Sequence, residues 1–388
     1  MRYRPDLDGI RAIAVLAVMA SHTGVNFCYG GWMGVDVFFV LSGYLITSLL
    51  LSEHARSGVV SLRRFYGRRA LRLYPALLTM LLALGVTFWI GLGYGAMNDY
   101  IRSAVRSGLY LENIAASMSA PGYLPHTWSL AVEEQFYLVW PPILVLLLRK
   151  GRDPFRWALL GLVISWAAMT YYSAQGTVGY PNAYYLPWSR FGELLVGGAL
   201  ACVLAGSRTV PAAIRSNMAG YGLAIAGVCL VFVSQYKLRI PNLAWEAPSI
   251  ALVSGAMIWH LGANETGRLR ALFGGAPLRW LGQRSYGMYL IHLPVLYLLQ
   301  VHLRAHRSEL CALMVAATVL LAALSYRFVE LPFLRKKARF QGVLDLSSGT
   351  LTTMENRASD DVTIADATDG PDSASSARTA LFEPQTAT

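Results

Sequence analysis

Ten apolar runs recur along the chain, and short polar segments separate them. About 20 consecutive apolar residues are enough for an α-helix to cross a bilayer. Each run is therefore predicted to be a membrane-spanning helix. The predicted spans are residues 10–28, 33–52, 73–94, 128–148, 157–174, 188–205, 217–235, 247–263, 285–303 and 309–330.

Lys and Arg are divided unevenly among the segments that join these runs. The N-terminus, the even-numbered connections and the segment after the last run hold 22 of them, whereas the odd-numbered connections hold 6. Cytoplasmic loops of membrane proteins are enriched in Lys and Arg. The pattern predicts a multi-pass protein of the plasma membrane with both termini in the cytoplasm.

Composition supports a membrane protein and separates a tail from it. Of the 388 residues, 55% are hydrophobic and only 14% are charged, against about 25% charged in an average soluble domain. The net charge is +11, yet residues 341–388 hold eight acidic residues and two arginines. We predict an all-α bundle over residues 1–340 and a disordered acidic tail over 341–388, which has few large apolar residues. The basic residues cluster at span ends, so no nucleic-acid partner is expected.

Several common signals are missing from the sequence. The four cysteines have no CxxC or metal-ligand spacing, and we interpret them as packing residues without a metal site. No P-loop, G-x-S-x-G or H-E-x-x-H motif occurs. The first apolar run lacks a small-x-small cleavage site and is expected to be an uncleaved anchor.

Arg11 and His22 are the polar positions of the first run that suggest chemistry. Eleven residues of α-helix rotate by about 1100°, which is about 20° more than three turns. The two side chains are therefore predicted to share one helix face, roughly 16 Å apart along the axis. A titratable imidazole in a lipid-length helix is costly unless it faces protein or a polar cavity. His22 is either a buried residue satisfied by a neighbour or a functional group.

Arginines are concentrated between the second and third runs. Arg68, Arg69 and Arg72 have helical spacing and are predicted to form one patch. Pro75 is predicted to lie in the first turn of the third span, where proline is tolerated. The patch is either a topology signal or a clamp for the phosphates of an anionic cofactor.

A further polar group opens the fourth run. Helical geometry puts His126 and Glu133 on one stripe, with Ser129 beside it and Glu134 about 100° away. Two carboxylates that enter a membrane span are rare unless they are paired or functional. They are predicted either to form an ion pair with a residue such as Arg190 or to serve a reaction.

The second and ninth runs also contain polar positions. Asp36 opens the second, and Tyr289 and His292 share one face of the ninth. Pro294 leaves the Leu290 carbonyl without its helical donor. Each of these groups is either a contact between helices or part of a site.

These groups together suit acyl transfer from acyl-CoA to a hydroxyl. A neutral histidine is a general base near pH 7, and a hydroxyl acceptor needs one. The diphosphate and 3′-phosphate of an acyl-CoA favour forked cations. The thioester oxygen needs a hydrogen-bond donor as charge develops on it.

The motifs resemble those of the integral-membrane acyltransferase 3 family, over residues 5–332. The resemblance is carried by Arg11-x10-His22, Gly34-Val-Asp36-x-Phe-Phe-x-Leu-Ser42-Gly43, Arg69-x-x-Arg72 after Phe65-Tyr66, His126-x-Trp128-Ser129-Leu-x-Val-Glu133-Glu134-x-Phe136-Tyr137 and Ser285-Tyr286-x-x-Tyr289-Leu-x-His292. It implies a ten-span core that moves an acyl group from cytoplasmic acetyl-CoA or another short-chain acyl-CoA to a hydroxyl, usually on a sugar. No permanently bound cofactor is expected.

The resemblance implies His22 as the catalytic residue, acting as general base or as acyl carrier, with Arg11 in support. With it, we predict three groups of site residues: catalytic His22, Glu133, Arg11 and Asp36, donor-binding Arg68, Arg69 and Arg72, and substrate-binding His126, Ser129, Glu134, Tyr289 and His292.

The acceptor and the alternatives remain open at this stage. Longer relatives carry an additional SGNH-type domain, which is not expected here. A peptidoglycan-type mechanism in which two domains pass on the acyl group is therefore not expected either. Stand-alone relatives acylate surface or exported glycans, or macrolide antibiotics, and the low lysine content favours a natural-product enzyme. A transporter or flippase is the alternative, because ten spans with charges near the midplane also suit transport. The sequence does not predict the oligomeric state.

Overall fold

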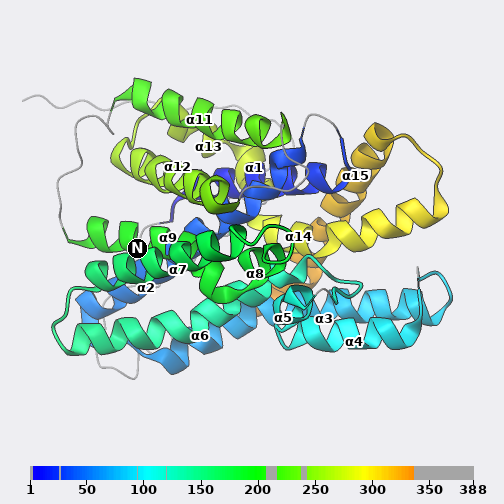
Figure 1. Ribbon diagram of the computed structural model, residues 1–388, viewed down its shortest axis with the longest axis horizontal. Coiled ribbons are helices and arrows are strands. Elements are labelled where there is room, and N and C mark those ends of the chain that lie inside the picture. Colours follow the sequence, from blue (N-terminus) through cyan, green and yellow to red (C-terminus); the bar gives the residue numbers. More distant parts are fainter. Residues whose placement is uncertain are drawn as a thin grey trace, which may run out of the picture. The chain divides into compact units, whose positions relative to one another are not determined.

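The computed structural model describes residues 3–25, 28–93, 95–118, 120–206, 216–236 and 243–335. The regular structure of these residues is entirely helical, without a β-strand among them (Figure 1). The predicted all-α class is confirmed. The predicted acidic tail, 341–388, lies outside the described residues.

A long helix lies at each of the ten predicted spans. These helices are α1 (Pro5–His22), α2 (Gly34–Ser57), α3 (Leu62–Trp89), α6 (Thr127–Arg149), α7 (Pro154–Ser173), α9 (Pro187–Ala205), α11 (Asn217–Tyr236), α12 (Leu243–Ala263), α14 (Ala276–His302) and α15 (Arg307–Ser325). The shorter elements are the 3₁₀-helix η1 (Tyr29–Met33), α4 (Met97–Gly108), α5 (Glu112–Ser117), α8 (Tyr180–Tyr185), α13 (Arg268–Phe273) and the π-helix η2 (Tyr326–Glu330).

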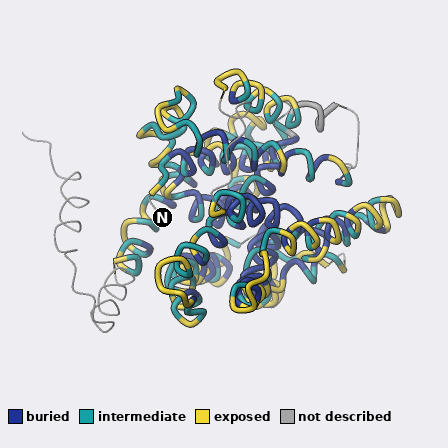
Figure 2. The backbone as a smooth tube through the Cα atoms, turned by 90° about the vertical axis from the view of Figure 1, so that its left-hand side faces the viewer, coloured by how far each residue is buried: buried dark blue, intermediate teal, exposed yellow. Residues whose placement is uncertain are grey.

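Five helical segments of the described chain are long and apolar enough to cross a membrane. They are Gly30–Ser57, Leu62–Trp89, Thr127–Arg149, Tyr180–Ala205 and Arg307–Arg335. Large apolar side chains on their outer faces, such as Leu82 and Trp89, are exposed. The buried residues gather where the helices face one another (Figure 2). This distribution fits a bundle whose outer surface is covered by lipid.

Glycines set the closest helix contact in the bundle. α2 packs against α9, and α9 against α7. A Cβ atom at Gly43 would lie 1.8 Å from the Leu194 carbonyl oxygen, and one at Gly197 would lie 2.0 Å from that of Val40. Small residues allow such close backbone approach between membrane helices. Gly43, within the motif of the second run, therefore has a packing role.

Several helix boundaries differ from those predicted, and those of α3 and α1 have a clear local cause. α3 begins at Leu62, where the Ser61 hydroxyl accepts a hydrogen bond from the Arg64 N–H and caps the helix. Pro75 therefore lies in the helix interior, and its predicted place in the first turn is wrong. α1 ends at His22, short of the predicted residue 28, because Gly24 adopts φ +69° just after it.

The connection between the third and fourth predicted spans, residues 95–127, contains α4 and α5. α4 lies beside α3 (Figure 1), and the Tyr100 hydroxyl donates to the Leu81 carbonyl. The Glu112 carboxylate accepts the Gly122 N–H at 2.7 Å. Burial raises the pKa of Glu112, and this N–H offsets part of the rise. The segment is thus anchored to the bundle just before His126.

Candidate active site

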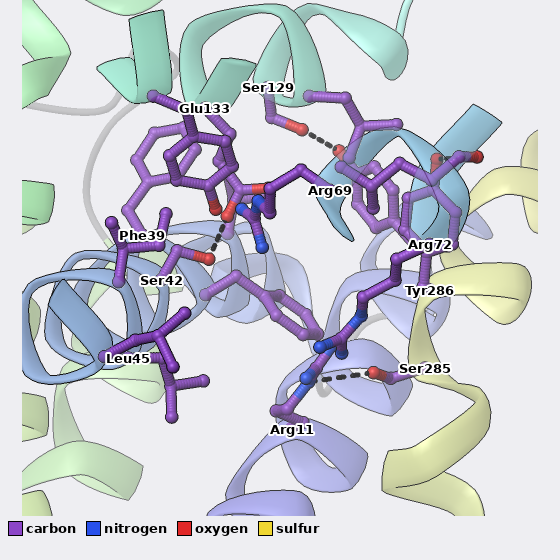
Figure 3. Close-up of a pocket in the computed structure, with 18 of the residues that line it drawn as sticks. Arg11, Phe39, Ser42, Leu45, Arg69, Arg72, Ser129, Glu133, Ser285 and Tyr286 are labelled. Atoms are coloured by element: carbon purple, nitrogen blue, oxygen red, sulfur yellow. Dashed lines mark hydrogen bonds between the residues drawn. The ribbon is translucent and has the colours of Figure 1, made fainter. Parts of the chain in front are cut away.

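A cavity of about 280 Å³ lies between α1, α2, α3, α6 and α14 (Figure 3). It brings together polar residues from all five helices. They are Arg11, Ser42, Arg68, Arg69, Arg72, Ser129, Glu133, Tyr137, Ser285, Tyr286 and Tyr289. Seven of these were predicted as site residues from the sequence, from three apolar runs and from the arginine-rich connection before the third run.

One end of the cavity is basic. Arg11 donates from Nε to the Ser285 hydroxyl at 3.2 Å, and the Arg72 guanidinium lies beside Arg11 (Figure 3). Among the described residues, Arg72 has no hydrogen-bond or ion-pair partner. Arg68 is paired with Glu53 at 3.2 Å and is therefore partly neutralised. The open guanidinium donors of Arg72 are suited to an anionic ligand.

A carboxylate lies deeper in the cavity. Glu133 accepts a hydrogen bond from the Ser42 hydroxyl (Figure 3). The Arg69 guanidinium stacks over the Tyr137 ring at 3.7 Å and interacts electrostatically with Glu134 and Glu133. Both carboxylates therefore have Arg69 as their nearest cation, and neither pairs with Arg190.

Two hydroxyl groups lie at the inner end. The Ser129 and Tyr289 hydroxyls are 2.6 Å apart, and Tyr289 also donates to the His126 carbonyl at 2.9 Å. Ser129 and Tyr289 are buried but line the cavity. They separate the cavity from the imidazoles beyond them.

Three imidazoles form a row behind Tyr289. The ring centroids of His126 and His292 are 5.2 Å apart, and those of His292 and His22 are 5.1 Å apart. His126 and His292 are buried, whereas His22 is exposed. The row therefore runs from the cavity wall to the surface of the bundle.

Each imidazole donates one N–H to a backbone carbonyl. His22 Nδ1 lies 2.8 Å from the Val18 oxygen, His292 Nδ1 2.6 Å from the Tyr289 oxygen, and His126 Nε2 3.0 Å from the Leu290 oxygen. A carbonyl only accepts, so these nitrogens carry the proton in the neutral rings. The second nitrogen of each ring is then a base, and His22 Nε2 is the one on the exposed residue.

Three proline-freed carbonyls receive donors from other helices. Pro294 deprives the Leu290 carbonyl of its helical donor, as predicted, and His126 supplies the replacement. Pro141 and Pro142 do the same to residues 137 and 138, and the Tyr66 hydroxyl lies 3.2 Å and 3.5 Å from their oxygens. Proline thus fixes the positions of His126 and Tyr66.

Five predicted site residues lie outside the cavity lining: His22, His126 and His292 form the row behind Tyr289, and Asp36 and Glu134 lie elsewhere. Asp36 is fully buried in an ion pair with Arg190, and Glu193 lies 3.9 Å from the same guanidinium. Glu134 interacts with Arg69 but does not line the cavity. Asp36 thus belongs to a separate group of charges.

Sequence reasoning gave no role to four residues of the cavity lining, nor to Tyr66 outside it; the four are Ser42, Tyr137, Ser285 and Tyr286. Ser42 and Tyr137 lie in the motifs quoted above, and each contacts a charged cavity residue. Tyr66 could have been found from Pro141 and Pro142, which leave two carbonyls in need of a donor.

The family is established by comparison with known proteins. A family model described as an acyltransferase domain matches residues 4–327. The chain belongs to the integral-membrane acyltransferase 3 family. The predicted enzyme class is confirmed, and the transporter alternative is not supported.

Individual relatives match most of this chain's length. The chain is 34% identical over 351 residues to peptidoglycan O-acetyltransferase OatA of Listeria monocytogenes, covering 85% of this chain and 56% of that protein. It is 35% identical over 353 residues to the putative peptidoglycan O-acetyltransferase YrhL of Bacillus subtilis, covering 85% and 55%. A putative O-acetyltransferase of Staphylococcus aureus is 30% identical over 351 residues, covering 86% and 58%.

The chain spans about half the length of these relatives. None of the three is named as a macrolide acyltransferase, so the macrolide acceptor favoured from composition is not supported. Lysine content describes the whole chain and carries no information on an acceptor site. No solved structure matches the chain significantly.

Proposed function

We propose that this protein transfers an acetyl group from cytoplasmic acetyl-CoA to a hydroxyl of a cell-wall glycan on the other side of the membrane. The observation that carries the proposal is the continuous polar row from the arginine-lined cavity, through Tyr289 and the buried imidazoles, to exposed His22. The names of two relatives, which specify peptidoglycan, support a glycan of that kind as acceptor.

The donor enters at the basic end. The cation asymmetry of the sequence predicts that α1 and α3 begin on the cytoplasmic side. Arg11 and Arg72 then meet the donor phosphates near that side, with Arg69 further in. The acyl thioester lies toward Ser129 and Tyr289. The Tyr289 proton is held by the His126 carbonyl, so the Ser129 hydroxyl is the group that can turn from Tyr289 and donate to the thioester oxygen as charge develops.

His22 acts as the general base for the acceptor hydroxyl. Its Nδ1–H is held by the Val18 carbonyl, so Nε2 is free to take the proton of an acceptor hydroxyl. The hydroxyl oxygen bonds to the acyl carbon, the carbon–sulfur bond breaks, and the imidazolium returns its proton to the thiolate. For donor and acceptor to meet, the Ser129–Tyr289 contact must open.

The remaining predicted residues receive supporting roles. Glu133, held by Ser42, balances the charge of Arg69 and orients it in the cavity. His126 and His292 connect Tyr289 to His22 through their backbone and ring contacts, so the position of Tyr289 influences that of His22. Asp36, which is buried against Arg190, has a structural role.

Purified protein tests the proposal directly. Incubated with labelled acetyl-CoA and soluble peptidoglycan fragments, it should place the label on the glycan, and the His22→Ala variant should not. Label transfer to no glycan hydroxyl, together with movement of unmodified solute in liposomes, would contradict the proposal and favour a transporter.

A further inference from the structure

A second cavity, of about 400 Å³, adjoins the first at its basic end. The two share four residues in their linings: Arg11, Leu45, Arg72 and Tyr286. The second cavity is otherwise built by the start of α1, by α14 and by η2. A ligand whose anionic group lies between the two shared arginines would therefore extend into both cavities.

Glu330 and Tyr326 line this second cavity from the π-helix η2. A π turn is wider than an α turn and is rare in proteins. Where one occurs, it often lies at a functional site. Glu330 is only 6% exposed, and its Oε1 atom has no hydrogen-bond partner among the described residues. A Cβ atom at position 287 would lie 3.2 Å from this oxygen, so Gly287 leaves room for the carboxylate. A buried acceptor without a donor suggests a ligand that supplies one.

Three cations and an aromatic ring lie around Glu330. It interacts electrostatically with Arg72, Arg284 and Arg11. The Arg284 guanidinium lies over one face of the Tyr326 ring, 4.6 Å from its centre. The cavity thus offers a cationic wall, an aromatic ring and an anionic acceptor, in one enclosure.

This combination matches a nucleotide with an amino-bearing base. The cations suit phosphate, the ring suits a planar base, and a carboxylate accepts from an exocyclic amine but repels a ring carbonyl oxygen. Phosphate cannot lie against Glu330 itself, since both are negative. The base therefore belongs at Glu330, and the phosphates belong at the shared arginines.

We infer that the second cavity binds the adenosine end of the acyl-CoA donor, with Glu330 accepting a hydrogen bond from the adenine amine. The inference rests on the proposed function. The diphosphate then lies between Arg11 and Arg72, and the pantetheine arm runs through the first cavity toward Glu133 and Ser129. Glu330 selects the base of the donor and touches no reacting atom.

Three donors test the inference on the full chain in detergent. They are acetyl-CoA, its analogue with hypoxanthine in place of adenine, and S-acetyl-4′-phosphopantetheine, which lacks the nucleoside. A hydrogen bond to a charged group is worth about 10- to 150-fold in binding. For the wild type, the Michaelis constant should rise by about that factor from acetyl-CoA to the hypoxanthine analogue, because a carbonyl oxygen replaces the amine.

The Glu330→Gln variant distinguishes recognition of the base by Glu330 from a structural effect of this residue on the cavity. Its amide can accept from adenine or donate to hypoxanthine, so the two nucleotide donors should differ by less than about 3-fold. Its Michaelis constant for acetyl-phosphopantetheine should equal that of the wild type. Glu265→Gln, an exposed glutamate elsewhere, should keep the wild-type preference for adenine.

Either of two results would overturn the inference while leaving the proposed function intact. The first is equal use of adenine and hypoxanthine donors by the wild type. The second is a Glu330→Gln defect that is as large with acetyl-phosphopantetheine as with acetyl-CoA, since Glu330 would then act through the arginines. Transfer from none of the three donors by the wild type would instead contradict the proposed function.

Discussion

Two groups of charged residues lie inside this bundle, and they differ in what surrounds them. Arg69 and Glu133 line a cavity, and the nearby Arg72 has no hydrogen-bond or ion-pair partner among the described residues. Arg190 and Asp36, with Glu193 close by, are fully buried and line neither of the two cavities described above. A charge inside a membrane protein is costly, so each group must be compensated.

The comparison indicates that charges neutralised by neighbouring side chains stabilise the fold, whereas charges with open donors bind a ligand. The ions around Arg190 are compensated by one another, and removing one leaves the others buried and uncompensated. The ions of the cavity are left with open donors, which a charged ligand can satisfy. Loss of a residue should therefore destabilise the fold in the first case and weaken catalysis or binding in the second.

The largest effect is expected at His22. His22→Ala should lower turnover by about 10²- to 10⁴-fold, the usual loss of a general base. Thermal stability should not change, because the side chain is exposed. Turnover is measured with labelled acetyl-CoA, and His302→Ala is the control at another exposed histidine. More than a tenth of wild-type turnover in His22→Ala would mean that the base lies elsewhere.

Arg190→Ala should lose stability rather than donor binding. Removing one partner of a buried ion pair typically costs about 3–5 kcal/mol. The apparent free energy of unfolding in detergent, measured by denaturant titration, should fall by that amount, and the folded fraction should retain the donor Michaelis constant. Arg152→Ala removes an exposed arginine and should be neutral. A fully stable but inactive Arg190→Ala protein would remove the distinction between the two groups.

Arg72→Ala should show the opposite behaviour. Losing a hydrogen bond to a charged group costs about 1.5–3 kcal/mol, so the Michaelis constant for the donor should rise by roughly 10- to 150-fold. The constant for the acceptor and the unfolding free energy should stay near wild type. Arg72→Lys should recover only part of the loss, because the guanidinium fork is missing. An unchanged donor constant would leave Arg72 as a topology signal.

The smallest effect is expected at Tyr66, which belongs to neither group. Tyr66→Phe removes the donor to the two proline-freed carbonyls of α6. An ordinary hydrogen bond contributes about 0.5–1.5 kcal/mol, so the unfolding free energy should fall by about that much. Activity at low temperature should be retained. A large loss of activity without a loss of stability would place Tyr66 in the reaction.

The sequence was sufficient for the helices and for most of the cavity. Apolar length predicted the ten helical segments, and helical spacing predicted that Ser129 and Glu133 would lie close together. Pro294 also predicted an orphaned carbonyl at Leu290, for which the structure supplies His126 as the donor. These features depend on local periodicity and on backbone chemistry, which a single segment contains.

Contacts between distant segments could not be predicted in the same way. Nothing local distinguishes Asp36 from Glu133, since each is a carboxylate near the start of a span. Only the packing of α2 against α9 gives Asp36 its partner Arg190. The acidic residue of the second cavity, Glu330, depends likewise on a π turn that apolar periodicity does not indicate.

The central claim is that donor and acceptor approach from opposite ends of the polar row. Sealed vesicles of known orientation test it, with acetyl-CoA, which does not cross the membrane, on one side and peptidoglycan fragments on the other. We expect label on the glycan only when acetyl-CoA is on the side of the α1 N-terminus and the glycan is on the side of His22, and none with His22→Ala. Label that appears only when both substrates share one side would contradict the account.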